Sequence, residues 1–370
     1  MGQPALAPEP IDRPPASGSA DQTTGDIGGD GPDPSLEALL ENPERSPARK
    51  RLVLAIRVLV SAGMLAFLIW KIEEEGVGDM IPEWTTASTL WLAGALGLTL
   101  AGIVLSALRW QVVLHALGQR PQLRRLLSLY LAGQFVANVL PTSIGGDVLR
   151  VTRLSRDSGQ SHTSFASVVL ERMTGWIVLP VITFIGLVAN PGLFDRGPAG
   201  EIAGVVAVVV LLLLGTVLFA VGRRDYEADF DEPKGWRRFL AAVSFGLHRL
   251  RHHPAEVLNV VAVGFAYQLV LVLAAFMGAR ALQLQSDVGI TALLAFLPAV
   301  LIAQVLPVSI SGLGIREGLL VVLLDPLGVP RGRAIALGLM LYFLNLVVSL
   351  LGAPSFAVGN RGRRTGHVAA

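Results

Sequence analysis

The amino-acid sequence predicts an all-α, polytopic integral membrane protein, folded as a helical bundle with two re-entrant hairpins in an inverted repeat. Three observations indicate this class: 52% of the 370 residues are hydrophobic, only 16% are charged, and the mean hydropathy is +0.58. A soluble domain carries about 25% charged residues. The surplus apolar residues also lie in runs near the length of about 20 residues that crosses the hydrocarbon core of a bilayer.

The two ends of the chain differ in composition from the part between them. Residues 1–47 are rich in Pro, Gly, Ser and Asp and poor in aromatic residues. Such a segment cannot bury enough apolar surface to offset its chain entropy. We therefore expect a disordered cytoplasmic tail over residues 1–47, a transmembrane domain over 48–360 and a short basic cytoplasmic tail over 361–370.

Six apolar runs are expected to cross the membrane as helices. They cover residues 52–70, 90–108, 165–189, 202–221, 257–277 and 335–358. The first run begins after a long polar segment, so we interpret it as a retained helix rather than a cleavable signal peptide. Two further segments, 126–157 and 290–324, are interrupted near their middle, at Pro141 and Pro307. We expect each of these to enter and leave the membrane on the same face.

Basic residues gather in the segments between the apolar runs, and this distribution predicts the orientation. Clusters lie within residues 45–51, 109–125, 223–251 and 361–364. Cytoplasmic loops carry an excess of Lys and Arg. We therefore predict a multi-pass protein of the plasma membrane with both termini in the cytoplasm. Because the basic residues follow the membrane-spanning runs, a nucleic-acid partner is disfavoured despite the pI near 9.2.

An internal repeat relates the two interrupted segments. Residues 133–150 align with residues 299–316 at a constant offset, since 306 − 140 = 166. Broken apolar segments in corresponding halves of a membrane protein are the best sequence indication of a transport site near the bilayer midplane. The basic loops put the two copies on opposite faces, which predicts an inverted pair. Identical residues at aligned positions include Ala137 and Ala303, Pro141 and Pro307, Ser143 and Ser309, Gly146 and Gly312, and Arg150 and Arg316.

The first interruption has the residues of an anion site. Pro141 ends the preceding helix because proline has no N–H group and its ring clashes with the previous turn. Gly145 and Gly146 permit a tight turn, after which the N–H groups at a helix N-terminus attract anions such as phosphate. Arg150 follows about one turn later. The alternative interpretation is a helix-breaking turn whose small residues only allow tight packing.

Charged residues inside the other apolar segments are the remaining candidates. Arg316 and Glu317 follow the second interruption, where the alternative is a structural ion pair. Glu171 and Arg172 are neighbours in a helix and point about 100° apart, so we expect separate partners, with Glu171 facing Arg150 or Arg316. Arg172 could instead reach the cytoplasmic interface. The predicted lipid-phosphate site comprises Ser143, Gly145, Gly146, Asp147, Arg150, Glu171, Arg172, Ser309, Gly312, Arg316 and Glu317.

Other site classes are not expected. The chain contains no cysteine, which excludes disulfides and thiol catalysis. The histidines have no metal-ligand spacing, and no nucleophile elbow, P-loop or dinucleotide fingerprint stands in a suitable setting. We therefore predict no cofactor, no metal and no catalytic residue. Arg109 and Trp110 end the second apolar run and are interpreted as interfacial anchors.

Four sequence blocks in order resemble a known family. These are RW-x-x-V-L (109–114), LPTSIGGDVLR (140–150), SVVLER-x-x-G (167–175) and LPVSISGLGIREG (306–318). They are similar to the signature blocks of the flippase-like membrane domain family, which includes the membrane half of lysylphosphatidylglycerol synthase, also called multiple peptide resistance factor. The resemblance implies re-entrant hairpins and movement of lipids between leaflets. Ser311 departs from the family, which often has glycine there.

The leading functional hypothesis is translocation or binding of a phospholipid or a lipid-linked phosphate intermediate. Two alternatives are an ion-coupled transporter of a small anion and a membrane-embedded lipid transferase. Since the chain ends soon after its last apolar run, we do not expect the soluble aminoacyl-transferase domain or enzyme activity. A separate lipid-modifying enzyme is then a candidate partner, besides the membrane lipid itself.

Overall fold

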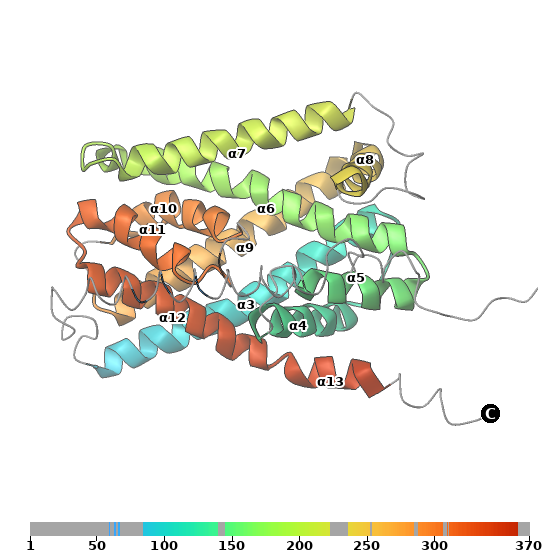
Figure 1. Cartoon of the computed structure of the whole chain (residues 1–370), viewed down its shortest axis with the longest axis horizontal. Coiled ribbons are helices and arrows are strands. Elements are labelled where there is room, and N and C mark those ends of the chain that lie inside the picture. Colours follow the sequence, from blue (N-terminus) through green and yellow to red (C-terminus); the bar gives the residue numbers. More distant parts are fainter. Residues whose placement is uncertain are drawn as a thin grey trace, which may run out of the picture.

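Every regular element in the part of the chain that the structure describes is a helix (Figure 1). The computed structural model describes residues 59, 63, 66, 84–139, 145–222, 236–251, 254–284, 288–305, 309 and 311–361. Its helices are α3 (Thr86–Ala116), α4 (Leu123–Val139), α5 (Gly145–Ser158), α6 (Ser161–Ala189), η2 (Pro191–Leu193), α7 (Ala199–Gly222), α8 (Trp236–Arg251), α9 (Pro254–Ala281), α10 (Ile290–Ala303), α11 (Ile315–Leu324), η4 (Asp325–Leu327), α12 (Arg331–Leu350) and α13 (Ala353–Arg361).

Five of these helices, α3, α6, α7, α9 and α12, are long and apolar enough to cross a membrane. They correspond to five of the six predicted runs, and each of α3, α6, α7 and α9 extends beyond its predicted bounds. The sixth run, 52–70, lies outside the described residues except for three helical positions. The predicted tails, 1–47 and 361–370, also lie outside them except for Arg361, the last residue of α13. The protein is therefore a multi-pass helical membrane protein.

The last predicted helix, 335–358, was wrong as a continuous span. The structure divides it into α12, which ends at Leu350, and α13, which begins at Ala353. Pro354 explains the division, because its ring would clash with the carbonyl of Leu350 and it cannot donate the next helical hydrogen bond. The guanidinium of Arg153 fixes the new direction by donating to the backbone carbonyls of Ser355 and Phe356, both at 2.9 Å.

Helices α4 and α5 form an antiparallel pair that is too short to cross the membrane. They contain 17 and 14 residues, or about 25 Å and 21 Å at 1.5 Å per residue, against a core of about 30 Å. Arg125 near the start of α4 pairs with Asp157 near the end of α5 at 2.6 Å. A Cβ on Gly146 would lie 2.3 Å from the carbonyl oxygen of Gly133, so the two backbones touch.

Helices α10 and α11 form a second short pair, which packs with α6, α9 and α12 around its own apolar core. Figure 1 shows α10 and α11 near the end of the bundle where α3 begins, and α5 and α8 near the other end, with α6 between them. The segment before α11 touches the end of α4, because the hydroxyl of Ser311 donates to the carbonyl of Ala137 at 3.3 Å.

The turn before α11 requires an unusual backbone conformation. Ser311, Gly312 and Gly314 all have positive φ, at 51°, 75° and 86°. Glycine adopts this region without the Cβ penalty that other residues meet. Ser311 adopts this conformation at the steric cost of its Cβ. Its hydroxyl makes a contact to α4 that a glycine could not make.

Small residues let the long helices pack closely, which gives a first prediction. A Cβ on Gly186 of α6 would lie 2.3 Å from the backbone nitrogen of Ala295 in α10. The Gly186→Ala variant should therefore force α6 and α10 apart and destabilise the protein by about 1–3 kcal/mol, the usual range for overpacking. The thermal unfolding midpoint of the purified protein would measure this loss.

A matched control stands on α7, where a Cβ on Gly215 would have no neighbour within 4 Å. Gly215→Ala should leave the midpoint unchanged or raise it slightly. Equal midpoints for the two alanine variants would contradict the close approach of α6 and α10.

Candidate functional site

The centre of the bundle holds a carboxylate between two guanidinium groups. Glu171 of α6 is 1% exposed. Its Oε1 accepts a hydrogen bond from Arg109 Nη2 at 2.6 Å, and its Oε2 accepts one from Arg150 Nη2. Arg109 lies in α3 and Arg150 in α5, so Glu171 connects three helices. Each charge is buried, and the pairing offsets the cost of removing it from water.

Aromatic rings surround the two arginines. The guanidinium carbon of Arg150 lies 4.2 Å from the ring centre of Trp110 and 4.4 Å from that of Tyr130. That of Arg109 lies 4.9 Å from the ring centre of Tyr267. A cation over an aromatic face at these distances is stabilised by the ring quadrupole. The rings therefore hold both guanidinium planes in place.

A second ion pair extends the site toward the side of the bundle. Asp147, in the first turn of α5, accepts a hydrogen bond from Nε of Arg172 and lies 3.5 Å from Nη1 of Arg150. We call Arg109, Asp147, Arg150, Glu171 and Arg172 the central charge cluster. Its three guanidinium groups and two carboxylates leave one excess positive charge, which favours an anionic ligand.

Several buried donors of this cluster have no hydrogen-bond partner. They are Nε and Nη1 of Arg109 and Nε of Arg150. The side-chain oxygen of Gln268, on α9, is also buried without a partner. An unsatisfied buried polar group costs about 1–3 kcal/mol, and more when it is charged. Together with the excess positive charge, these donors indicate capacity for a further anionic acceptor.

The second interrupted segment holds a smaller site. Glu317 is fully buried; its Oε2 accepts from the backbone N–H of Gly314 at 2.6 Å, and its Oε1 accepts from Nε and Nη2 of Arg316 at 3.1 and 2.9 Å. The guanidinium of Arg316 lies over the ring of Tyr342, with 5.3 Å to its centre. The hydroxyl of Ser309 is buried without a partner. The ion pair leaves this site without net charge.

The predicted site residues thus form two sets. Asp147, Arg150, Glu171 and Arg172 come together, whereas Arg316 and Glu317 pair with each other near the turn of Ser309 and Gly312. Gly145 and Gly146 begin α5, and Ser143 lies outside the described residues. Among the two partners expected for Glu171, the structure selects Arg150.

Sequence reasoning missed part of the cluster. Arg109 and Trp110, expected as interfacial anchors, are both buried at the centre, and Trp110 donates to Ser167 at 2.9 Å. The sequence also gives no sign that Tyr130 and Tyr267 contact these arginines. The available signal was Glu171, because a carboxylate in a long apolar run requires a cation from another helix. In the described residues, no group of three or more His, Asp or Glu side chains could hold a metal ion.

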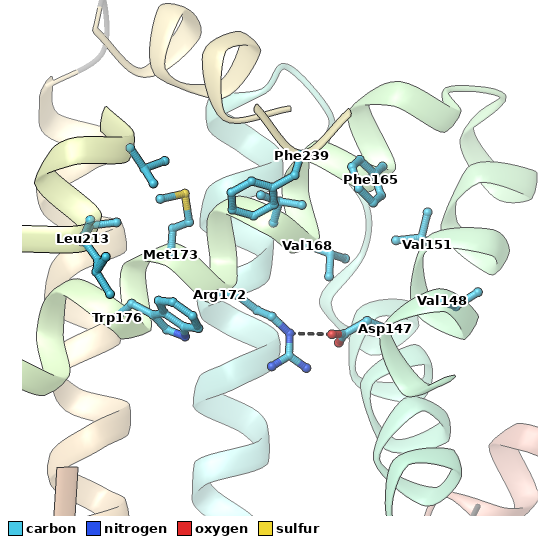
Figure 2. Close-up of a pocket in the computed structure, with 13 residues that line it drawn as sticks. Asp147, Val148, Val151, Phe165, Val168, Arg172, Met173, Trp176, Leu213 and Phe239 are labelled. Atoms are coloured by element: carbon cyan, nitrogen blue, oxygen red, sulfur yellow. Dashed lines mark hydrogen bonds and ion pairs between the residues drawn. The ribbon is translucent and has the colours of Figure 1, made fainter. Parts of the chain in front are cut away.

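An apolar cavity adjoins the cluster (Figure 2). It has a volume of about 650 Å³ and lies between α5, α6, α7 and α8. Apart from Asp147 and Arg172, all of its lining side chains are apolar or aromatic. Figure 2 shows the ion pair of these two residues at one edge of the cavity, away from Phe165 and Phe239.

Comparison with known proteins assigns the family. Residues 54–352 match the family model described as lysylphosphatidylglycerol synthase TM region. A UPF0104 membrane protein of Archaeoglobus fulgidus is 25% identical over 216 residues, which cover 55% of this chain and 64% of the relative. A UPF0104 membrane protein of Methanothermobacter thermautotrophicus is 29% identical over 165 residues, covering 43% of this chain and 48% of the relative. The match thus spans less than two thirds of either relative. Since the family model covers most of the present sequence, the chain belongs to the lysylphosphatidylglycerol synthase TM region family.

Proposed function

We propose that this protein binds the phosphate of an anionic phospholipid, or of a lipid-linked phosphate intermediate, inside the helical bundle and moves it between the leaflets of the plasma membrane. The observation that carries the proposal is the central charge cluster, with its excess positive charge and its unsatisfied guanidinium donors. Guanidinium groups match the geometry of phosphate oxygens. Membership of a family described by a lipid-modifying enzyme supports a lipid as the ligand.

The roles within the cluster follow from its contacts. Arg109 and Arg150 have free donors for phosphate oxygens, whereas Glu171 holds both groups in position. Asp147 is an acceptor, so it serves as the countercharge of Arg172 and not as a phosphate ligand. Arg316 is the repeat counterpart of Arg150. It would contact the phosphate from the other half of the bundle once one of its hydrogen bonds to Glu317 is broken.

Two features support movement and not only binding. The helices of the α4–α5 and α10–α11 pairs are too short to cross the membrane, and the two pairs are in contact, because Ser311 before α11 donates to Ala137 at the end of α4. We propose that both pairs are re-entrant, enter from opposite faces and form an inverted repeat, an arrangement that permits alternating access around a central site. The basic loops beside α4, α5 and α8 would then face the cytoplasm, as would both termini.

No comparable observation supports the two alternatives, a membrane-embedded lipid transferase and a transporter of small anions. Each carboxylate that a transferase could use as a base, namely Asp147, Glu171 or Glu317, is engaged by a guanidinium group. A transporter of small anions would use the same cluster but would not need the apolar cavity beside it.

Identification of a copurified lipid tests the proposal directly. Native mass spectrometry of the protein, released from a mild detergent, should detect one tightly held lipid that contains phosphate and carries net negative charge. The Arg109→Gln variant should retain less of it, because it loses two unsatisfied donors and one positive charge. Retention of only zwitterionic lipids, equally in both proteins, would contradict the proposal.

A further inference from the structure

The cavity beside the central charge cluster opens on the membrane-facing side of the bundle. Trp176 and Leu213 line it, and these residues are 43% and 60% exposed. Both belong to helices long and apolar enough to span the bilayer, so we expect these exposed surfaces to face hydrocarbon. A lipid chain can therefore enter the cavity without crossing a polar surface. Its volume, about 650 Å³, lies within the range of about 300–1,000 Å³ typical of ligand pockets.

One edge of this cavity carries a guanidinium group that can donate further hydrogen bonds. Arg172 has a half-exposed side chain and donates through Nε to Asp147. Figure 2 shows its two terminal nitrogens directed away from that carboxylate. Asp147 also lies 3.5 Å from Arg150, so it links the exposed guanidinium to the buried ones. The cavity thus combines an apolar wall, an accessible cation and a connection to the central site.

A second cavity, which also lies against α6 and α7, provides a comparison. It has a volume of about 760 Å³ and lies along α6 and α7, toward η2. Its lining is equally apolar, but the charged residue within it is Glu201, a carboxylate. Two cavities of similar size therefore differ in charge: the second presents a carboxylate alone, whereas the first presents the guanidinium of Arg172, paired with Asp147, beside a cluster with one excess positive charge. An anionic lipid should prefer the first.

We propose that the cavity between α5, α6, α7 and α8 seats an acyl chain of an anionic phospholipid, whose phosphate pairs with Arg172 before it reaches Arg150. The inference rests on the proposed function, and it identifies this cavity as the place where the lipid enters on its way to the central charge cluster. In the free protein the carboxylate of Asp147 pairs with both Arg172 and Arg150. An arriving phosphate competes with this carboxylate for Arg172 and is then within one side chain of the buried cluster.

Photo-crosslinking in lipid nanodiscs tests this seat. The probes are phosphatidylglycerol and phosphatidylcholine, each with a diazirine in one acyl chain, and the labelled residues are mapped by peptide mass spectrometry. Phosphatidylglycerol should label the wall formed by Met173, Leu213 and Val217 more strongly than phosphatidylcholine does. Arg172→Gln should lower labelling by phosphatidylglycerol about tenfold, the effect of losing a charge-assisted contact.

Matched variants separate the seat from general contact with bilayer lipid. Leu213→Trp narrows the first cavity at an exposed position, and Val208→Trp, also exposed, narrows the second. Only Leu213→Trp should reduce labelling of the first cavity. Equal labelling of both cavities by both probes, or no effect of Arg172→Gln, would overturn the proposal.

The two proposals fail in different ways. Selective labelling at the cavity without leaflet exchange by the wild-type protein would leave the seat intact and reject translocation. Leaflet exchange of phosphatidylglycerol without labelling at the cavity would support translocation and reject this entry point.

Discussion

Replacing Glu171 with glutamine is expected to destabilise the protein by about 3–5 kcal/mol, the range measured when one partner of a buried ion pair is removed. The change leaves Arg109 and Arg150 buried at the centre of the bundle with no shared carboxylate. Their positive charges then repel each other in a medium of low dielectric constant. The thermal unfolding midpoint of the purified protein should fall accordingly.

Two further variants test the cause of this loss. Asp157→Asn removes an ion pair with Arg125 whose side chains are 37% and 46% exposed, and exposed pairs contribute only about 0–1 kcal/mol. Its midpoint should stay near that of the wild type. Combining Glu171→Gln with Arg109→Gln removes one of the two opposed cations and should recover part of the stability. A Glu171→Gln variant as stable as Asp157→Asn would contradict the ion-pair assignment.

Replacing Arg150 with lysine is expected to lower leaflet exchange of an anionic lipid by about tenfold to a hundredfold, as hydrogen bonds to charged groups contribute about 1.5–3 kcal/mol. Lysine keeps the charge but loses the planar fork that reaches Glu171 and lies between the rings of Trp110 and Tyr130. Exchange of a fluorescent phosphatidylglycerol in reconstituted vesicles measures the effect. Arg316→Lys should lower it in the same direction, because the repeat makes Arg316 the counterpart of Arg150.

The control for this prediction lies on the same helix. Arg153 donates to backbone carbonyls near the start of α13 and takes no part in the cluster. Arg153→Lys should therefore preserve exchange. Wild-type exchange by both Arg150→Lys and Arg316→Lys would reject the relay of phosphate between the two arginines and favour purely structural ion pairs.

Much of the fold was predictable because membrane-spanning helices have a strong compositional signal. Residues 165–189 and 257–277 were identified as helices from apolar length alone, and α6 and α9 include them. Both helices begin before the predicted runs, at Ser161 and Pro254, because polar residues and a proline in the first turn can start a helix outside the hydrocarbon core. The break before Pro354 was also available from the sequence, but the apolar run around it concealed the helix end.

The site was predictable only in part, for a physical reason. Sequence spacing indicated that Glu171 and Arg172 point to different partners, and they do. It could not indicate that Arg109 would be a partner of Glu171, because an arginine at the end of an apolar run is equally suited to the membrane interface. Which cation faces a buried carboxylate depends on how helices α3, α5 and α6 pack, and no local pattern records that packing.

Transbilayer movement of an anionic phospholipid is the measurement that tests the central claim most directly. Vesicles containing the wild-type protein and a fluorescent phosphatidylglycerol would be treated with a reductant that cannot cross the membrane. We predict that fluorescence falls beyond the outer-leaflet fraction lost in protein-free vesicles, and that Arg150→Lys slows this extra loss. A plateau identical to that of protein-free vesicles, with folded protein confirmed by its unfolding midpoint, would contradict the account.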